Sequence, residues 1–198
     1  MLRHLFVPLL LAATAAVTAP GVLDEGRLDP AWFGGPGVEF RETGEVDYVW
    51  MKPGFTADGR TFWVKPWEEP AWLGKDRDAQ DAAAAEELTK AMQGRFKAAL
   101  ATSLRGKAKA SLYSGDVIVQ GRLVDVNTLK AKFSGAATWD IKFVDAKSGE
   151  LLLAVHHRAV NANFMSGLPE RIWKWMGEFG ADLRYDFPDY QKGKPRRT

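Results

Sequence analysis

The chain has 198 residues, of which 46% are hydrophobic and 26% charged, a composition typical of a globular protein with one domain and a sizeable core. Its formal net charge is only +2, so the chain lacks the basic surplus of a general nucleic-acid-binding protein. Cysteine is absent, which excludes disulfides, thiolate metal sites, a cysteine nucleophile and a lipid anchor on an N-terminal cysteine.

Residues 1–19 have the pattern of a signal peptide. Arg3 is followed by an apolar run, Leu5 to Val17, that is shorter than the about 20 residues needed to span a bilayer. Small residues follow this run, so we expect cleavage between Ala15 and Ala19. The sequence thus predicts an exported protein without a transmembrane span in its mature form. We expect it in the periplasm, with outer-membrane association or secretion as alternatives; a buried N-terminal strand or helix is the competing interpretation.

Residues 20–38 are rich in proline and glycine, which is typical of a leader without regular structure. Trp32 and Phe33 are expected to anchor this leader to the surface of one α+β domain, residues 39–188. Two short strands should open the domain, from Glu45 to Met51 and from Arg60 to Lys65. The aromatic side chains of Trp63, Trp67 and Trp72 could pin loops to the core or form a platform for a glycan or a partner protein.

A long amphipathic helix should begin at Asp78 or Asp81 and end near Leu104. Its apolar side chains recur every four residues, a spacing that places them on one face toward a sheet. These residues are Leu88, Met92, Phe96, Leu100 and Leu104.

Three strands form the centre of the predicted sheet: Asp116 to Val126, Ala137 to Val144 and Leu151 to Val160. Alternating apolar and polar residues indicate half-buried antiparallel strands, and a turn containing Gly149 should join the last two. The helix-facing set is Val117, Val119, Leu123, Trp139, Ile141, Phe143, Leu151, Leu153 and Val155. We expect Trp139 to be buried between sheet and helices.

A second amphipathic helix is expected to begin near Pro169 and to end near Tyr185, before a basic, disordered tail at residues 189–198. The element order is strand, strand, helix, three strands, helix. Both helices have one apolar face, so the sequence predicts a two-layer α+β sandwich, with two helices on one face of a mainly antiparallel sheet of about five strands.

The opposite face of the sheet collects polar residues: Gln120, Arg122, Thr138, Asp140, Lys142, His156 and Arg158. Four of them, Arg122, Asp140, His156 and Arg158, could form an acid–base or anion-binding site. We favour a simpler interpretation, an exposed face on which opposite charges pair weakly. His156 should then titrate near its usual pKa of about 6.5.

Neither a metal nor a cofactor is expected, and no residue is assigned a catalytic role. His156 and His157 are adjacent, so on a strand they point to opposite faces and cannot chelate one ion. The sequence contains no H-E-x-x-H motif and no glycine-rich phosphate loop.

Four segments together resemble a known group of proteins: Tyr48 to Pro53 with its Pro-Gly exit, the alanine-rich helix, the strand from Asp116 to Val126 and the hairpin turn Asp145 to Glu150. The chain from about residue 40 to 187 resembles uncharacterised envelope proteins of Gram-negative bacteria, many of them lipoproteins. Their domain is similar to the TolB amino-terminal and curli-secretion α/β domains. The resemblance implies a non-catalytic envelope role, often in an assembly, and transfers no functional residue. This chain lacks the lipobox cysteine, so membrane anchoring does not carry over.

Three functional hypotheses follow. The first is a non-catalytic exported protein that binds another envelope component or associates with itself. The second is a hydrolase or ligand-binding enzyme that uses Asp140, His156 and Arg158. The third is a glycan-binding module built on the tryptophan-rich N-terminal half. An enzyme needs its polar groups to converge in a concave pocket, whereas a binding module needs an exposed surface.

Overall fold

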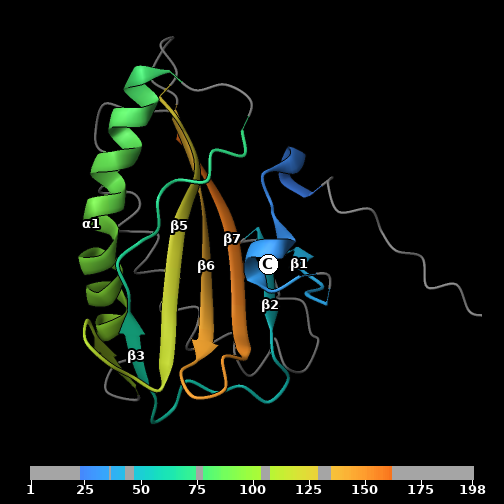
Figure 1. The fold of residues 1–198 in the computed structure, drawn as a ribbon, viewed down its shortest axis with the longest axis vertical. Coiled ribbons are helices and arrows are strands. Elements are labelled where there is room, and N and C mark those ends of the chain that lie inside the picture. The colour runs from blue at the N-terminus through green and yellow to red at the C-terminus, as the bar shows by residue number, and fades with distance from the viewer. Residues whose placement is uncertain are drawn as a thin grey trace, which may run out of the picture.

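A computed structural model describes residues 23–35, 37–42, 47–74, 78–103, 108–128 and 135–161, and Figure 1 shows their arrangement. The expected signal peptide, second helix and basic tail lie outside these residues. Within them, no helix is long and apolar enough to cross a membrane.

The described strands form one seven-stranded sheet in the order β1-β2-β7-β6-β5-β3-β4. Strand β3 is parallel to β4 and β5, and the other pairs are antiparallel. The strands are β1 (Arg41–Glu42), β2 (Tyr48–Met51), β3 (Thr61–Val64), β4 (Lys109–Ser111), β5 (Val117–Asn127), β6 (Gly135–Asp145) and β7 (Leu151–Asn161). The expectation of about five mainly antiparallel strands is therefore wrong in detail, because the sheet is mixed. Strands β1 and β4 were missed because two or three residues are too few to show an alternating pattern.

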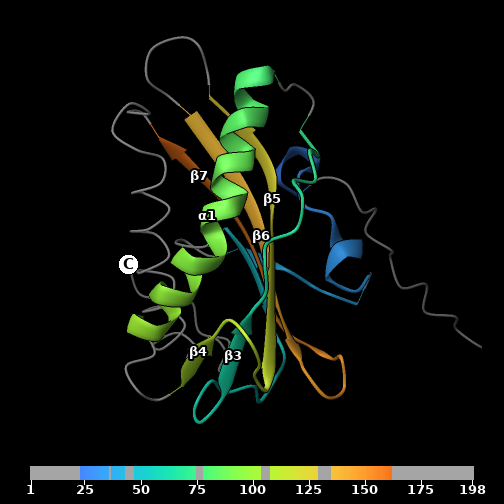
Figure 2. The same cartoon turned by 60° about the vertical axis from the view of Figure 1, so that its left-hand side comes forward.

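Helix α1 (Ala79–Ser103) lies close to the predicted range. It begins with a reciprocal pair of hydrogen bonds in which Asp78 Oδ1 accepts from the backbone N–H of Asp81, and Asp81 Oδ2 accepts from that of Asp78. Four residues of the predicted apolar stripe, Leu88, Met92, Phe96 and Leu100, are buried against the sheet, with Met92 and Phe96 fully enclosed; Leu104 lies outside the described residues. The helix packs on β3, β4 and β5 (Figure 2).

The three central strands pair as predicted, and Trp139 is confirmed as a fully buried core residue, with 0% of its surface exposed. Gly149 closes the hairpin between β6 and β7 with a φ of 75°, a conformation that other residues resist. The predicted helix-facing set is wrong at Leu151, which lies on the opposite face of the sheet. A bulge pairs Phe143 with Leu153 but Val144 with Leu151, so the alternation is interrupted. Leu152 joins the core beneath α1, whereas Leu151 packs against the opposite cluster.

The segment predicted to be an unstructured leader instead covers the second face of the sheet. We call residues 23–40, apart from Pro36, the N-terminal segment. It contains two single-turn 3-10 elements, η1 (Leu23–Gly26) and η2 (Pro30–Phe33). Leu28 and Phe33 are buried with Ala154 of β7 in a second apolar cluster. Figures 1 and 2 place α1 and the N-terminal segment on opposite sides of the sheet, so the described fold has three layers where two were expected.

Candidate functional site

The central strands bring three of the predicted site residues side by side. Arg122 of β5 pairs with Asp140 of β6, which pairs with His156 of β7. Because opposed residues in adjacent strands point to the same face, the three side chains form a row across the sheet. Arg158 lies two residues beyond His156 on the same strand. We call these four residues the polar cluster; the sequence predicted their grouping correctly.

Strong hydrogen bonds join the row. Arg122 donates to Asp140 Oδ2 from Nε at 3.0 Å and from Nη2 at 2.8 Å. The other carboxylate oxygen of Asp140 lies 2.7 Å from Nδ1 of His156. The exposed fractions of Arg122, Asp140 and His156 are 8%, 0% and 0%. The expectation of an exposed, hydrated face is therefore wrong.

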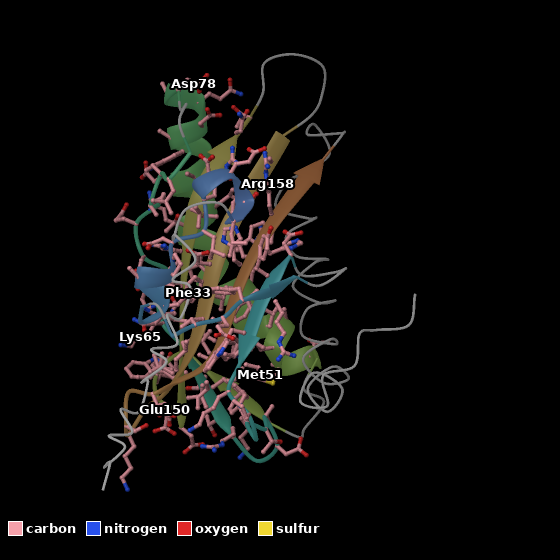
Figure 3. All side chains as sticks on the ribbon, turned by 90° about the vertical axis from the view of Figure 1, so that its right-hand side faces the viewer. Phe33, Met51, Lys65, Asp78, Glu150 and Arg158 are labelled. Atoms are coloured by element: carbon pink, nitrogen blue, oxygen red, sulfur yellow. The ribbon has the colours of Figure 1, made fainter. Side chains whose placement is uncertain are left out.

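The row is buried because the N-terminal segment lies over it, with carboxylates that contact the basic groups of the polar cluster. Asp24 Oδ2 lies 3.1 Å from Nε2 of His156, and Asp24 Oδ1 lies 3.7 Å from Nη1 of Arg158. Asp29 Oδ2 accepts a hydrogen bond from Arg122 Nη2 at 3.4 Å. Figure 3 shows the segment across the strands, with the labelled Phe33 on it and the labelled Arg158 beside η1.

Trp32 covers the Arg122 end of the cluster. Its ring lies under the Arg122 guanidinium at 4.5 Å and under Lys142 Nζ at 4.1 Å, two cation–π contacts on one indole. Its Nε1 donates to Glu68 at 2.8 Å, and its backbone carbonyl accepts from Lys142 at 2.8 Å. Sequence reasoning foresaw Trp32 as an anchor but missed the carboxylates of Asp24, Asp29 and Glu68. The available signal was charge complementarity between acidic residues in the leader and a basic strand face.

The surroundings of two basic groups shift their pKa values. Burial lowers the pKa of Lys142, and the negative charge of Glu68 opposes this shift only in part. Burial would also lower the pKa of His156, but hydrogen bonds to Asp140 and Asp24 outweigh it, so the pKa of His156 is raised above its usual value. This direction contradicts the expected titration near the ordinary value.

The geometry of His156 explains why the charged form is favoured. A neutral imidazole has one N–H and can donate to one carboxylate only, whereas an imidazolium donates from both nitrogens. Both ring nitrogens of His156 face carboxylate oxygens, those of Asp140 and Asp24. The arrangement is therefore complete only when His156 is doubly protonated.

This arrangement is poorly suited to acid–base catalysis. A general base needs a nitrogen within hydrogen-bond reach of the proton that it removes. Both nitrogens of His156 are occupied by carboxylates, and its side chain has no exposed surface. Among the described residues, no group of three or more His, Asp or Glu side chains is arranged to hold a metal ion.

The three tryptophans proposed as a platform separate in the structure. Trp67 is buried in the main core, with its ring centroid 6.5 Å from that of Phe96, and Trp72 packs against the same core. Trp63 is half-buried, donates to the carbonyl of Leu112 at 3.1 Å and lies beneath Lys65. Two of the three thus anchor the core, and a ligand-binding role for Trp63 stays a prediction.

Comparisons with known proteins give limited information. No family model and no curated protein matches the chain. Among solved structures, a PelC dodecamer from Paraburkholderia phytofirmans aligns at 10% identity and a TM-score of 0.45 over 68% of this chain and 94% of its own. A Xanthomonas campestris protein of the DUF330 family aligns at 9% identity and a TM-score of 0.39, covering 79% of this chain and 95% of its own. Such likeness supports no functional argument, and similarity to TolB or curli-secretion domains is not shown.

Proposed function

We propose that this chain is a non-catalytic exported protein of the cell envelope that binds another envelope component or associates with itself. The observation that carries the proposal is the occupation of the polar cluster by the chain's own N-terminal segment. The cluster is the feature on which the hydrolase hypothesis depends, and here it holds a protein segment in place.

Export is supported by the sequence of residues 1–19. The basic start, the apolar run from Leu5 to Val17 and the small residues after it form the pattern that secretion machinery recognises. Intact-mass measurement of protein from a periplasmic extract tests this step. We expect a chain beginning between residues 16 and 20; a cytoplasmic product that still starts at Met1 would contradict export.

An association surface is supported at the β4 edge of the sheet. Strand β4 ends the strand order, so one side of it has no neighbour among the described strands. Tyr113 follows it and is 86% exposed, and aromatic side chains are enriched at protein–protein interfaces. This edge is therefore the first place to look for a partner.

Site-specific photo-crosslinking at position 113 in intact cells, followed by mass spectrometry, tests the proposed association. We expect adducts with a second copy or with another envelope protein, and fewer adducts from a photo-crosslinker at exposed Arg41 in β1, at the opposite edge of the sheet. Absence of adducts at position 113, together with a strictly monomeric mature protein by light scattering, would contradict the proposal. Hydrolysis of a model ester or glycoside that disappears in Asp140→Asn would favour the enzyme hypothesis instead.

A further inference from the structure

The N-terminal segment is held to the sheet in a manner unlike any strand. Among the described residues its backbone hydrogen bonds join its own residues, for example Arg27 to Asp24 and Gly34 to Ala31. Its contacts with the sheet are ionic side-chain pairs, the Trp32 contacts and a small apolar cluster. Attachment through side chains leaves the segment separable without breaking the sheet's ladder of backbone hydrogen bonds.

The turn at the start of the segment is strained. Asp24 and Glu25 have φ values of 46° and 53°, in the left-handed region that residues other than glycine rarely adopt. Such conformations persist only where surrounding contacts hold them. Within the segment, Arg27 contacts the Asp24 carbonyl and the Glu25 carboxylate. The contacts that tie the turn to the sheet are those of Asp24 with His156 and of Asp24 and Glu25 with Arg158. Strain in η1 therefore favours release whenever the contact with His156 weakens.

We propose that the polar face of β5, β6 and β7 is a pH-gated docking site whose ligand is the chain's own acidic segment from Asp24 to Trp32, with doubly protonated His156 as the gate. When His156 loses one proton, only one of its two carboxylate contacts keeps an N–H. The contact with Asp140 is shorter and fully buried, so the proton stays there and Asp24 meets the ring's lone pair. The attraction between Asp24 and His156 then becomes a repulsion, and only the longer ion pairs with Arg158 still hold η1.

Other charged or titratable groups surround His156, and their contributions to the pH dependence must be distinguished from that of His156. They come from every packed element: Asp24, Glu25 and Asp29 from the N-terminal segment, Asp47 and Tyr48 at β2, Arg122 of β5, Asp140 of β6, and Arg158 of β7 together with His157, which reaches Asp47. Carboxylates and arginines ordinarily keep their charge between pH 6 and 9. Lys142 does hold the segment through Trp32, and its pKa is lowered by burial, so the test needs variants in which Lys142 is unchanged.

Thiol labelling provides the test, because the full-length mature chain contains no native cysteine. Leu28→Cys places one thiol between the N-terminal segment and the sheet, and Glu87→Cys places one on the exposed side of α1. The ratio of their labelling rates cancels the intrinsic pH dependence of thiol chemistry. We expect this ratio to rise about tenfold between pH 6 and 9, because loss of the Nε2 proton removes one charge-assisted hydrogen bond to Asp24, which is worth about a factor of ten. Met92→Cys on the buried face of α1 should stay unlabelled throughout, which excludes global unfolding.

Two matched variants decide whether His156 is the gate. In Asp24→Asn the amide can donate to the neutral ring, so the segment is held equally by both forms and the ratio should be flat with pH. In Asp29→Asn the lost contact is with Arg122 alone, so the segment should be looser at every pH but keep its pH dependence. A labelling ratio that does not change with pH in the chains that carry only the cysteine substitutions would overturn the proposal. An unchanged pH dependence in Asp24→Asn would overturn it as well.

A second measurement needs no cysteine. Tryptic cleavage after Arg27, whose side chain pairs with Asp125 and Glu25, requires the segment to leave the sheet. Intact mass should show cleavage of the otherwise unaltered chain rising with pH between 7 and 9, relative to cleavage at Lys147 in the exposed hairpin turn. A constant ratio would overturn the proposal even if Leu28→Cys fails to fold.

Discussion

The two faces of the central sheet are held by different forces, although the same three strands supply both. Beneath α1 the strands present Trp139, Ile141 and Phe143, all with no exposed surface, to an apolar helix stripe. On the other face alternate residues of the same strands present Arg122, Asp140 and His156 to an acidic segment. Burial of apolar area is non-directional and insensitive to pH, whereas paired charges depend on protonation and on every partner being present. The helix face therefore stabilises the fold, and the polar face can respond to conditions.

Truncating the core should give the largest effect and defines the helix side of this comparison. We expect Trp139→Ala to lower the free energy of unfolding by about 3–5 kcal/mol, because it removes a fully buried indole and leaves a cavity. Urea denaturation followed by circular dichroism measures it. Tyr113→Ala, at an exposed position, is the control and should change stability by about 0.5 kcal/mol or less. Equal losses in the two variants would contradict the assignment of Trp139 to the core.

Removing the central carboxylate of the polar face should cost nearly as much. Asp140→Asn leaves Arg122 and His156 without their shared buried partner, and breaking a buried pair typically costs about 3 kcal/mol or more. The same urea experiment measures the loss. Asp116→Asn is a control at an exposed carboxylate that accepts one backbone hydrogen bond from Thr61, and it should cost about 1 kcal/mol. If Asp140→Asn costs no more than Asp116→Asn, the polar cluster is not an integral part of the fold.

An intermediate effect is expected where a strand approaches the core without a side chain. A Cβ built on Gly121 of β5 would lie 2.5 Å from Cε2 of Trp67, so the buried indole would have to move. We expect Gly121→Ala to destabilise the protein by about 1–3 kcal/mol through overpacking. Gly94→Ala in α1, where a Cβ meets nothing within 4 Å, is the matched control. It should raise the thermal midpoint slightly, because alanine is the better helix former; a lower midpoint in both variants would refute the packing argument.

The sequence predicted the helix side of the molecule well and the polar side incompletely, for one physical reason. Periodicity reports which residues of a strand share a face, so it correctly predicts that Arg122, Asp140 and His156 lie on one face. It does not report what covers that face. The cover is a proline- and glycine-rich segment without periodicity, held by contacts such as Asp24 to His156 across 132 positions of sequence.

Two further errors concern the pairing of strands. A one-residue bulge reversed the face of Leu151, and such a bulge leaves no pattern in a short run of leucines. The parallel pairing of β3 with β5 was missed because the two strands are separated in sequence by α1 and β4. Neither composition nor spacing indicates that β5 pairs with β3 in the parallel direction. These features depend on tertiary packing, which local propensity does not encode.

The smallest expected effect concerns pH and separates the two faces most directly. The folded-state pKa of His156 is raised, so the stability that its charge contributes is fully present below the unfolded value of about 6.5 and is lost as pH rises through the folded pKa. We expect the free energy of unfolding to fall between pH 6 and 9. In His156→Gln most of the slope should disappear, leaving the contribution of Lys142, and in Asp24→Asn it should become smaller but persist, because Asp140 still favours the charged ring. Core variants such as Gly121→Ala should shift the whole curve and keep its slope, since they change no titrating group.

Urea midpoints at several pH values measure these slopes. An equal slope in the wild type and His156→Gln would mean that the polar face, like the helix face, is indifferent to protonation in this range.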